Sequence, residues 1–153
     1  MVTHAFPADL REVCGHLEST YPDEGCGVVL RHLADGRLTV IAMRNVYDRY
    51  HARDPVRFPR TARTAYLFDP LEWLAVSEAA ERAGEQVTCI FHSHADVGAY
   101  FSAEDRAMAA PDGLPLLPDV AYLVIAVDGG KSTAARAFVW KDGDFQEIPA
   151  TLS

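Results

Sequence analysis

Two histidines and a downstream aspartate are the side chains of this sequence best suited to bind a metal ion. His92 and His94 are separated by one residue, and Asp105 follows the second histidine by eleven residues. Two neutral imidazoles and one carboxylate give three protein ligands, the number that a catalytic zinc site uses while its fourth position stays open to water. A structural zinc site needs a fourth protein ligand. The spacing therefore predicts an open metal site of the catalytic type.

The residues before the histidines predict the strand that presents them. Residues 86–91 are largely apolar and β-branched, as in a buried strand. Side chains alternate between the two faces of a strand, so Ile90, His92 and His94 are expected on one face. Both imidazoles should therefore point the same way.

Helices and strands alternate along the rest of the chain. Apolar residues at helical spacing predict a helix from Leu10 to about Ser19, and Asp69 followed by Pro70 predicts the start of another that ends near Gly84. The other expected elements are strands over 25–32 and 37–44, a loop to about 66, a short helix over 102–110, a loop over 111–118, a strand over 120–128, and a hairpin over 134–140 and 145–148. This order predicts an α/β or α+β fold with a mixed β-sheet flanked by helices.

The composition predicts one domain over residues 1–153 in a reducing compartment. With 49% hydrophobic residues the chain can bury a core without disulfides, and its three cysteines have no Cys-x-x-Cys spacing. The first nine residues have no signal-peptide pattern, and the longest apolar run, 121–127, is too short to span a membrane. We therefore expect a cytoplasmic protein that does not bind membranes.

The charge distribution contains one basic region in an acidic chain. The net charge of −8 argues against binding to nucleic acid. Residues 44–63, however, contain six arginines and only two aspartates. Pro55 and Pro59 exclude a continuous helix through this region. It is either a solvated loop or a surface that meets an acidic partner.

A longer pattern resembles the signature of the JAMM, or MPN+ (Mov34/JAB), metallopeptidase family. His-x-His is followed after seven residues by Ser-x-x-Asp and is preceded by a glutamate in a Pro-x-Glu-x-Cys-Gly context. The expected order of elements also resembles that family over nearly the whole chain. One position departs from it, because Ala95 stands where many members have proline. The residues at the signature positions are Glu24, His92, His94, Ser102 and Asp105.

The resemblance implies a zinc-dependent hydrolase of amide or isopeptide bonds. One Zn²⁺ per chain would be bound by His92, His94 and Asp105, although iron or manganese suits the same ligands. Zinc lowers the pKa of its bound water from about 15.7 to about 7. Glu24 would then be the general base and later the acid toward the leaving amine. The hydroxyl of Ser102 would help to stabilise the oxyanion.

The resemblance also implies a protein substrate. The family cleaves after the Gly-ended C-terminal tail of ubiquitin-like proteins, and its small members resemble enzymes that act on sulfur-carrier proteins. Such a tail would pass near Tyr100 and Phe101, while Arg53 and Arg57 would contact acidic surface on the carrier. The oligomeric state stays open, with a dimer among the options.

Each candidate residue also has a simpler explanation. Ser102 and Asp105 match a capping box at the start of a helix, and Glu24 can be an exposed carboxylate at a strand end. Tyr100 and Phe101 can pack under their loop. A non-catalytic MPN-type scaffold or protein-binding module is the alternative function. Such modules usually lose metal ligands, whereas this chain keeps all of them.

Overall fold

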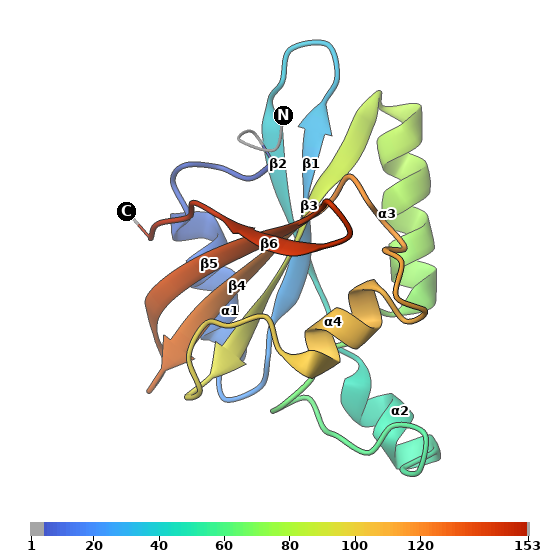
Figure 1. The fold of residues 1–153 in the computed structure, drawn as a ribbon, viewed down its shortest axis with the longest axis vertical. Coiled ribbons are helices and arrows are strands. Elements are labelled where there is room, and N and C mark those ends of the chain that lie inside the picture. The colour runs from blue at the N-terminus through green and yellow to red at the C-terminus, as the bar shows by residue number, and fades with distance from the viewer. Residues whose placement is uncertain (1–4, 153) are drawn as a thin grey trace.

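The computed structural model describes residues 5–152, which form one six-stranded sheet and four helices (Figure 1). The sheet order is β2-β1-β3-β4-β5-β6, with β3 and β4 parallel and all other neighbours antiparallel. This arrangement confirms the expected mixed sheet flanked by helices. The strands are β1 (Cys26–His32), β2 (Leu38–Met43), β3 (Glu85–Ala95), β4 (Ala121–Asp128), β5 (Lys131–Lys141) and β6 (Asp144–Ile148), and the helices are α1 (Arg11–Thr20), α2 (Tyr47–Arg53), α3 (Pro70–Arg82) and α4 (Ala103–Ala109).

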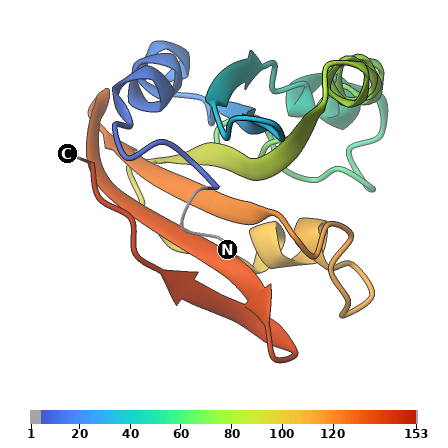
Figure 2. The same cartoon turned by 90° about the horizontal axis from the view of Figure 1, so that it is seen from above.

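Helices cover both faces of the twisted sheet (Figure 2). Val13 and Leu17 of α1 are fully buried in the apolar cluster on one face. Ala80 of α3 and Ala109 of α4 belong to the cluster on the opposite face. None of the helices within residues 5–152 is long and apolar enough to cross a membrane.

Strand β3 alternates between these two clusters. Phe91 is buried in the cluster under α1, whereas Ile90 belongs to the cluster shared with α3 and α4. Two residues further along, the His92 ring stacks on Tyr66 of that second cluster, with ring centroids 4.4 Å apart. The expected placement of both histidines on the Ile90 face is thus confirmed. Both imidazoles leave the sheet on the side of α3 and α4.

The expected loop between β2 and residue 66 is wrong in one respect, because it contains helix α2. The helix begins where the side-chain oxygen of Asn45 accepts a hydrogen bond from the amide of Tyr47, at 3.1 Å. It ends at Arg53, before Pro55, whose ring does not allow a helix to continue. The two prolines therefore do exclude a helix through the whole region, but they leave room for two turns ahead of them.

Candidate metal centre

The end of β3 and the start of α4 bring two histidines and an aspartate into contact. Nε2 of His92 lies 3.1 Å from Oδ1 of Asp105, and Nε2 of His94 lies 3.1 Å from Oδ2 of the same carboxylate. All three side chains are buried, and His92 is 0% exposed. Two ligands of a tetrahedral zinc ion with bonds of about 2.0 to 2.1 Å lie about 3.3 Å apart. Each histidine therefore lies about as far from the Asp105 carboxylate as two ligands of one ion lie from each other.

The hydrogen bonds of the histidines show that a cation fits this cluster. Nδ1 of His94 lies 3.0 Å from the carbonyl oxygen of Gly98. A carbonyl only accepts, so Nδ1 carries the proton, and Nε2 of the neutral ring turns a lone pair toward the Asp105 carboxylate. Two acceptors at hydrogen-bond distance need a proton or a metal ion between them. In His92 both ring nitrogens are buried; within residues 5–152 Nδ1 has no hydrogen-bond partner, and Nε2 lies 3.1 Å from Oδ1 of Asp105 without the alignment of a hydrogen bond. A divalent metal ion suits this donor set.

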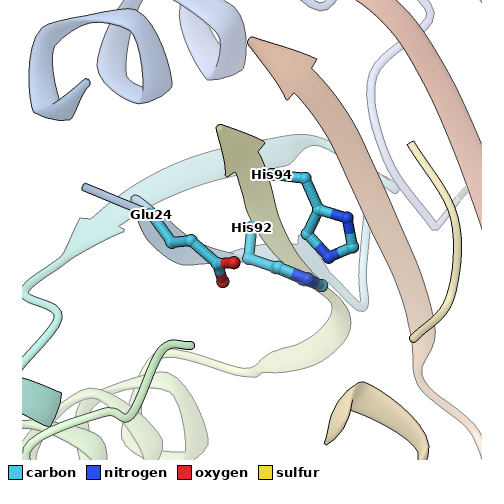
Figure 3. Close-up of side chains that lie close together, drawn as sticks. All are labelled: Glu24, His92 and His94. Atoms are coloured by element: carbon cyan, nitrogen blue, oxygen red, sulfur yellow. The ribbon is translucent and has the colours of Figure 1, made fainter. Parts of the chain in front are cut away.

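Glu24, two residues before the start of β1, points toward the same two histidines (Figure 3). One carboxylate oxygen of Glu24 and one nitrogen of each histidine all lie within 4.8 Å of one another. Glu24 is only 4% exposed, so the alternative of an exposed strand-end carboxylate is wrong. Burial, and next the negative charge of Asp105, raises the pKa of Glu24 to about 9, against a smaller opposing effect of Arg60. The carboxyl group therefore keeps its proton near neutral pH unless positive charge comes close.

The pairing of β1 with β3 sets the position of Glu24. The register places Cys26 opposite His92. Next to this pair, the amide of Gly25 donates to the hydroxyl oxygen of Ser93 at 2.8 Å, and the amide of Ser93 donates to the carbonyl of Gly25 at 3.1 Å. Ser93, the middle residue of the His-x-His motif, thus links the two histidines to the segment that carries Glu24. No role for Ser93 was predicted from the sequence, although its place in the motif is a usable signal.

Asn45 holds the backbone of Glu24 from the other side. Its side-chain amide donates to the carbonyl oxygens of Glu24 at 2.8 Å and Ala65 at 2.9 Å. Its side-chain oxygen accepts from the amides of Tyr47 and Leu67, both at 3.1 Å. One side chain therefore satisfies four backbone groups from three segments. Sequence reasoning missed Asn45 because its partners are distant in the chain and form no motif.

Ser102 and Asp105 do form the capping box that their spacing predicts. The Ser102 hydroxyl oxygen accepts from the Asp105 amide at 3.0 Å, and Oδ2 of Asp105 accepts from the Ser102 amide at 3.0 Å. The capping role and the contact with the histidines thus coexist. Burial alone would raise the pKa of Asp105, but His92 and His94 and the Ser102 amide hold it far below its usual value. The carboxylate is therefore ionised, as a metal ligand must be.

A groove of about 380 Å³ opens onto these side chains. Glu24, His94 and Ser102 line it together with Arg60, Arg63 and Tyr100. Tyr100 is 45% exposed, and its ring forms a T-shaped contact with the His94 ring, with 4.8 Å between centroids. The groove connects the buried cluster with the surface, so a substrate can reach it.

The other expected substrate contacts lie outside this groove. Arg53 and Arg57 are exposed and do not line it. Arg60 and Arg63, from the same basic region, do line it, and Arg60 forms an ion pair at 3.2 Å with Glu104. Phe101 packs in an aromatic cluster, which is the packing role that the sequence left open. Its ring neighbours there are Tyr122, Phe138 and Phe145.

Comparisons with known proteins cover the whole of this site. The family described as prokaryotic homologues of the JAB domain matches residues 6–141. A desampylase from Haloferax volcanii is 32% identical over 131 residues, which are 86% of this chain and 79% of that protein. Among solved structures, a protein from Desulfitobacterium hafniense matches with a TM-score of 0.65 at 24% identity, over 92% of this chain and 85% of that one. A protein from Salinibacter ruber matches with a TM-score of 0.60 at 26% identity, over 95% and 88% of the two chains.

Proposed function

Because the chain belongs to the family of prokaryotic homologues of the JAB domain, we propose that it is a zinc-dependent hydrolase of protein tails. It would cleave the amide or isopeptide bond after the Gly-ended tail of a ubiquitin-like or sulfur-carrier protein, with residues 1–153 as one catalytic domain. The observation that carries the proposal is the placement of the Asp105 carboxylate between His92 and His94, beside the buried carboxyl group of Glu24. The similarity to a protein named desampylase supports this choice of substrate class.

His92, His94 and Asp105 would hold the metal. A bound zinc ion would supply a Lewis acid, a water that loses its proton near neutral pH, and positive charge that lowers the pKa of a neighbouring carboxyl. The bond between His94 and the carbonyl of Gly98 keeps Nε2 of that ring available as a ligand. Iron and manganese accept the same ligand types, so reconstitution with each metal is needed to identify the natural one.

Glu24 would move the proton of the reaction. Its carboxylate would accept a proton from the attacking water as the water oxygen bonds to the scissile carbonyl carbon. It would then give that proton to the amine nitrogen as the carbon–nitrogen bond breaks. A buried carboxyl with a raised pKa suits both steps, because it can hold a proton near neutral pH and release it when positive charge is near.

Ser102 would stabilise the oxyanion that forms on the carbonyl oxygen. The hydroxyl oxygen accepts a hydrogen bond from the Asp105 amide. No acceptor within residues 5–152 takes the hydroxyl proton, which can therefore be donated into the groove that Ser102 lines. Within residues 5–152 the Ser102 hydroxyl has no hydrogen bond with a histidine, so the relay of a serine hydrolase is not formed.

The walls of the groove suggest how the tail and its protein would be held. Arg60, Arg63 and Tyr100 would contact the segment around the scissile bond, since they line the groove. Arg53 and Arg57 would contact acidic surface of the folded carrier, since they lie outside the groove and are exposed. This division gives the basic region two separate roles in binding.

A cleavage assay tests the proposal directly. Gly-Gly-ended carrier proteins with C-terminal extensions are incubated with the purified chain, with and without chelator. We expect cleavage after the Gly-Gly sequence that chelator abolishes and added zinc restores. His92→Ala should lose metal and activity together. A chain that binds no divalent metal and still binds a carrier would instead be the non-catalytic scaffold.

A further inference from the structure

Asp96, two residues after His94, has a backbone conformation that is unusual for a residue with a side chain. Its φ is 63°, in the left-handed region, which aspartate tolerates better than most residues do. Its amide donates to the carbonyl oxygen of Val127 at 3.0 Å. Its carboxylate accepts from the amide of Gly129 at 2.9 Å and from the hydroxyl of Tyr21 at 2.6 Å. Three hydrogen bonds, one with Tyr21 and two with residues 127–129, hold the residue in this conformation.

The two partners of the carboxylate come from segments that are far apart in the sequence. Tyr21 lies three residues before Glu24, on the segment that leads from α1 into β1. Gly129 lies in the turn between β4 and β5. A bond from a hydroxyl to an ionised carboxylate is among the stronger hydrogen bonds in proteins. Asp96 thus joins the segment that precedes Glu24 to the turn between β4 and β5.

The loop that Asp96 begins also controls the orientation of His94. Two residues after Asp96, the carbonyl of Gly98 accepts from Nδ1 of His94. The next carbonyl, of Ala99, accepts from the guanidinium of Arg136 at 3.3 Å. The loop is therefore tied to the sheet at both ends, with the carbonyl that orients His94 between the two ties. A shift of Asp96 would displace that carbonyl.

We propose that Asp96 is a positioning residue for the metal centre. By joining Tyr21 to the β4–β5 turn, it fixes residues 96–99 so that the Gly98 carbonyl holds the His94 ring with Nε2 toward the other ligands. It acts through His94 and contacts neither metal nor substrate. The inference rests on the metal site of the proposed function and adds a residue outside the signature positions.

Metal affinity and ligand geometry test the inference without an activity assay. Asp96→Gly removes the carboxylate but suits the positive φ, and Asp96→Asn keeps an acceptor at the same place. Asp142→Gly is the matched control, because Asp142 is an exposed aspartate with a φ of 54° in the β5–β6 turn. The full chain is titrated with zinc against a chromophoric chelator, and the absorption spectrum of the cobalt-loaded protein is recorded.

We expect Asp96→Gly to weaken zinc binding about 10- to 100-fold and to change the cobalt spectrum. Asp96→Asn should recover most of the affinity, and Asp142→Gly should match the wild type. Wild-type affinity and spectrum in Asp96→Gly would overturn the inference, as would an equal loss in Asp142→Gly. If Asp96→Gly does not fold, Tyr21→Phe removes one of the two side-chain bonds and should weaken zinc binding several-fold, and an unchanged affinity there overturns the inference.

The same titration separates this inference from the proposed function. A wild-type chain that binds no zinc, iron or manganese would contradict the proposed function and this inference with it. A wild-type chain that binds zinc, with variants that bind it equally well, would contradict only the role of Asp96.

Discussion

Replacing Glu24 by glutamine separates its role in proton transfer from any role as a metal ligand. The amide keeps the size of the side chain but cannot ionise. If Glu24 is the general base, Glu24→Gln should bind about one zinc ion per chain and should not hydrolyse the substrate. The same variant should also change the stability of the metal-free protein, because the carboxyl group is buried. The size of this change in stability can be calculated from the pKa of Glu24.

The raised pKa of Glu24 sets the size of this effect. The group has an ordinary pKa of 4.5 and a pKa of about 9 in the fold. Between these values the folded chain keeps a proton that the unfolded chain has released, so the free energy of unfolding falls as pH rises. Each pH unit in this interval is worth about 1.4 kcal/mol. From about pH 5 to about pH 7.5 the wild type should therefore lose about 3 kcal/mol that Glu24→Gln does not lose.

Denaturant unfolding of the chelator-treated proteins measures this difference. The free energy of unfolding is determined for both proteins across the pH range, and the other titrating groups cancel in the comparison. Glu104→Gln is the control, because Glu104 lines the same groove but has a half-exposed side chain. It should follow the wild type. Saturating zinc should reduce the difference between wild type and Glu24→Gln, since nearby positive charge favours the ionised carboxylate.

Two results would refute this reasoning. If wild type and Glu24→Gln share the same pH dependence, the carboxyl is ionised and solvated in the fold, and burial does not control its pKa. If Glu24→Gln loses zinc along with activity, Glu24 is itself a ligand. The distance alone allows this second outcome, because Glu24 and both histidines place ligand atoms within 4.8 Å of one another.

Three other substitutions test the remaining parts of the site. Ser102→Ala should lower kcat roughly 100- to 1000-fold through loss of the oxyanion donor, but cost only about 1 kcal/mol of stability through loss of the cap; unchanged steady-state hydrolysis would exclude the first role. Asn45→Ala leaves four backbone groups without their partner and should lower the free energy of unfolding by about 2 to 4 kcal/mol in denaturant titrations. A loss below about 1 kcal/mol would mean that water takes over the hydrogen bonds of the Asn45 side chain. Arg57→Glu should raise KM for a full-length carrier with little change in kcat, whereas Arg60→Glu should raise KM for a short tail peptide as well. Wild-type kinetics of both variants on both substrates would show that these arginines do not contribute to substrate binding.

The parts of the fold that the sequence predicts correctly depend on local interactions. Asp69 caps α3 by accepting from the amide of Leu71 at 2.9 Å, and Pro70 occupies the first turn, as the Asp-Pro pair indicates. Both predicted hairpins form around their Asp-Gly turns. Helix α2 was missed because its start depends on Asn45, whose other partners are far along the chain. A side chain with long-range partners leaves no periodic signal.

In the candidate site, too, the residues with local signals can be predicted and those with long-range partners cannot. Alternation along β3 and fixed spacing are enough to predict that His92, His94 and Asp105 meet. Glu24 reaches them only through the antiparallel pairing of β1 with β3, so it could be selected only through the resemblance to a family. Arg60 comes from an irregular segment with no spacing rule that links it to the histidines. Residues of this kind become visible only when the chain is folded.

Helix geometry explains why Ser102 and Asp105 must be three residues apart. A serine N-cap accepts from the amide of the third helical residue, and an acidic side chain at that residue returns the bond to the N-cap amide. This exchange uses one carboxylate oxygen of Asp105 and leaves the other at 3.1 Å from His92. It also uses the oxygen of Ser102 as acceptor, so the hydroxyl proton can be donated to substrate. The capping box is therefore the reason that one short helix can carry both the proposed metal ligand and the proposed oxyanion donor.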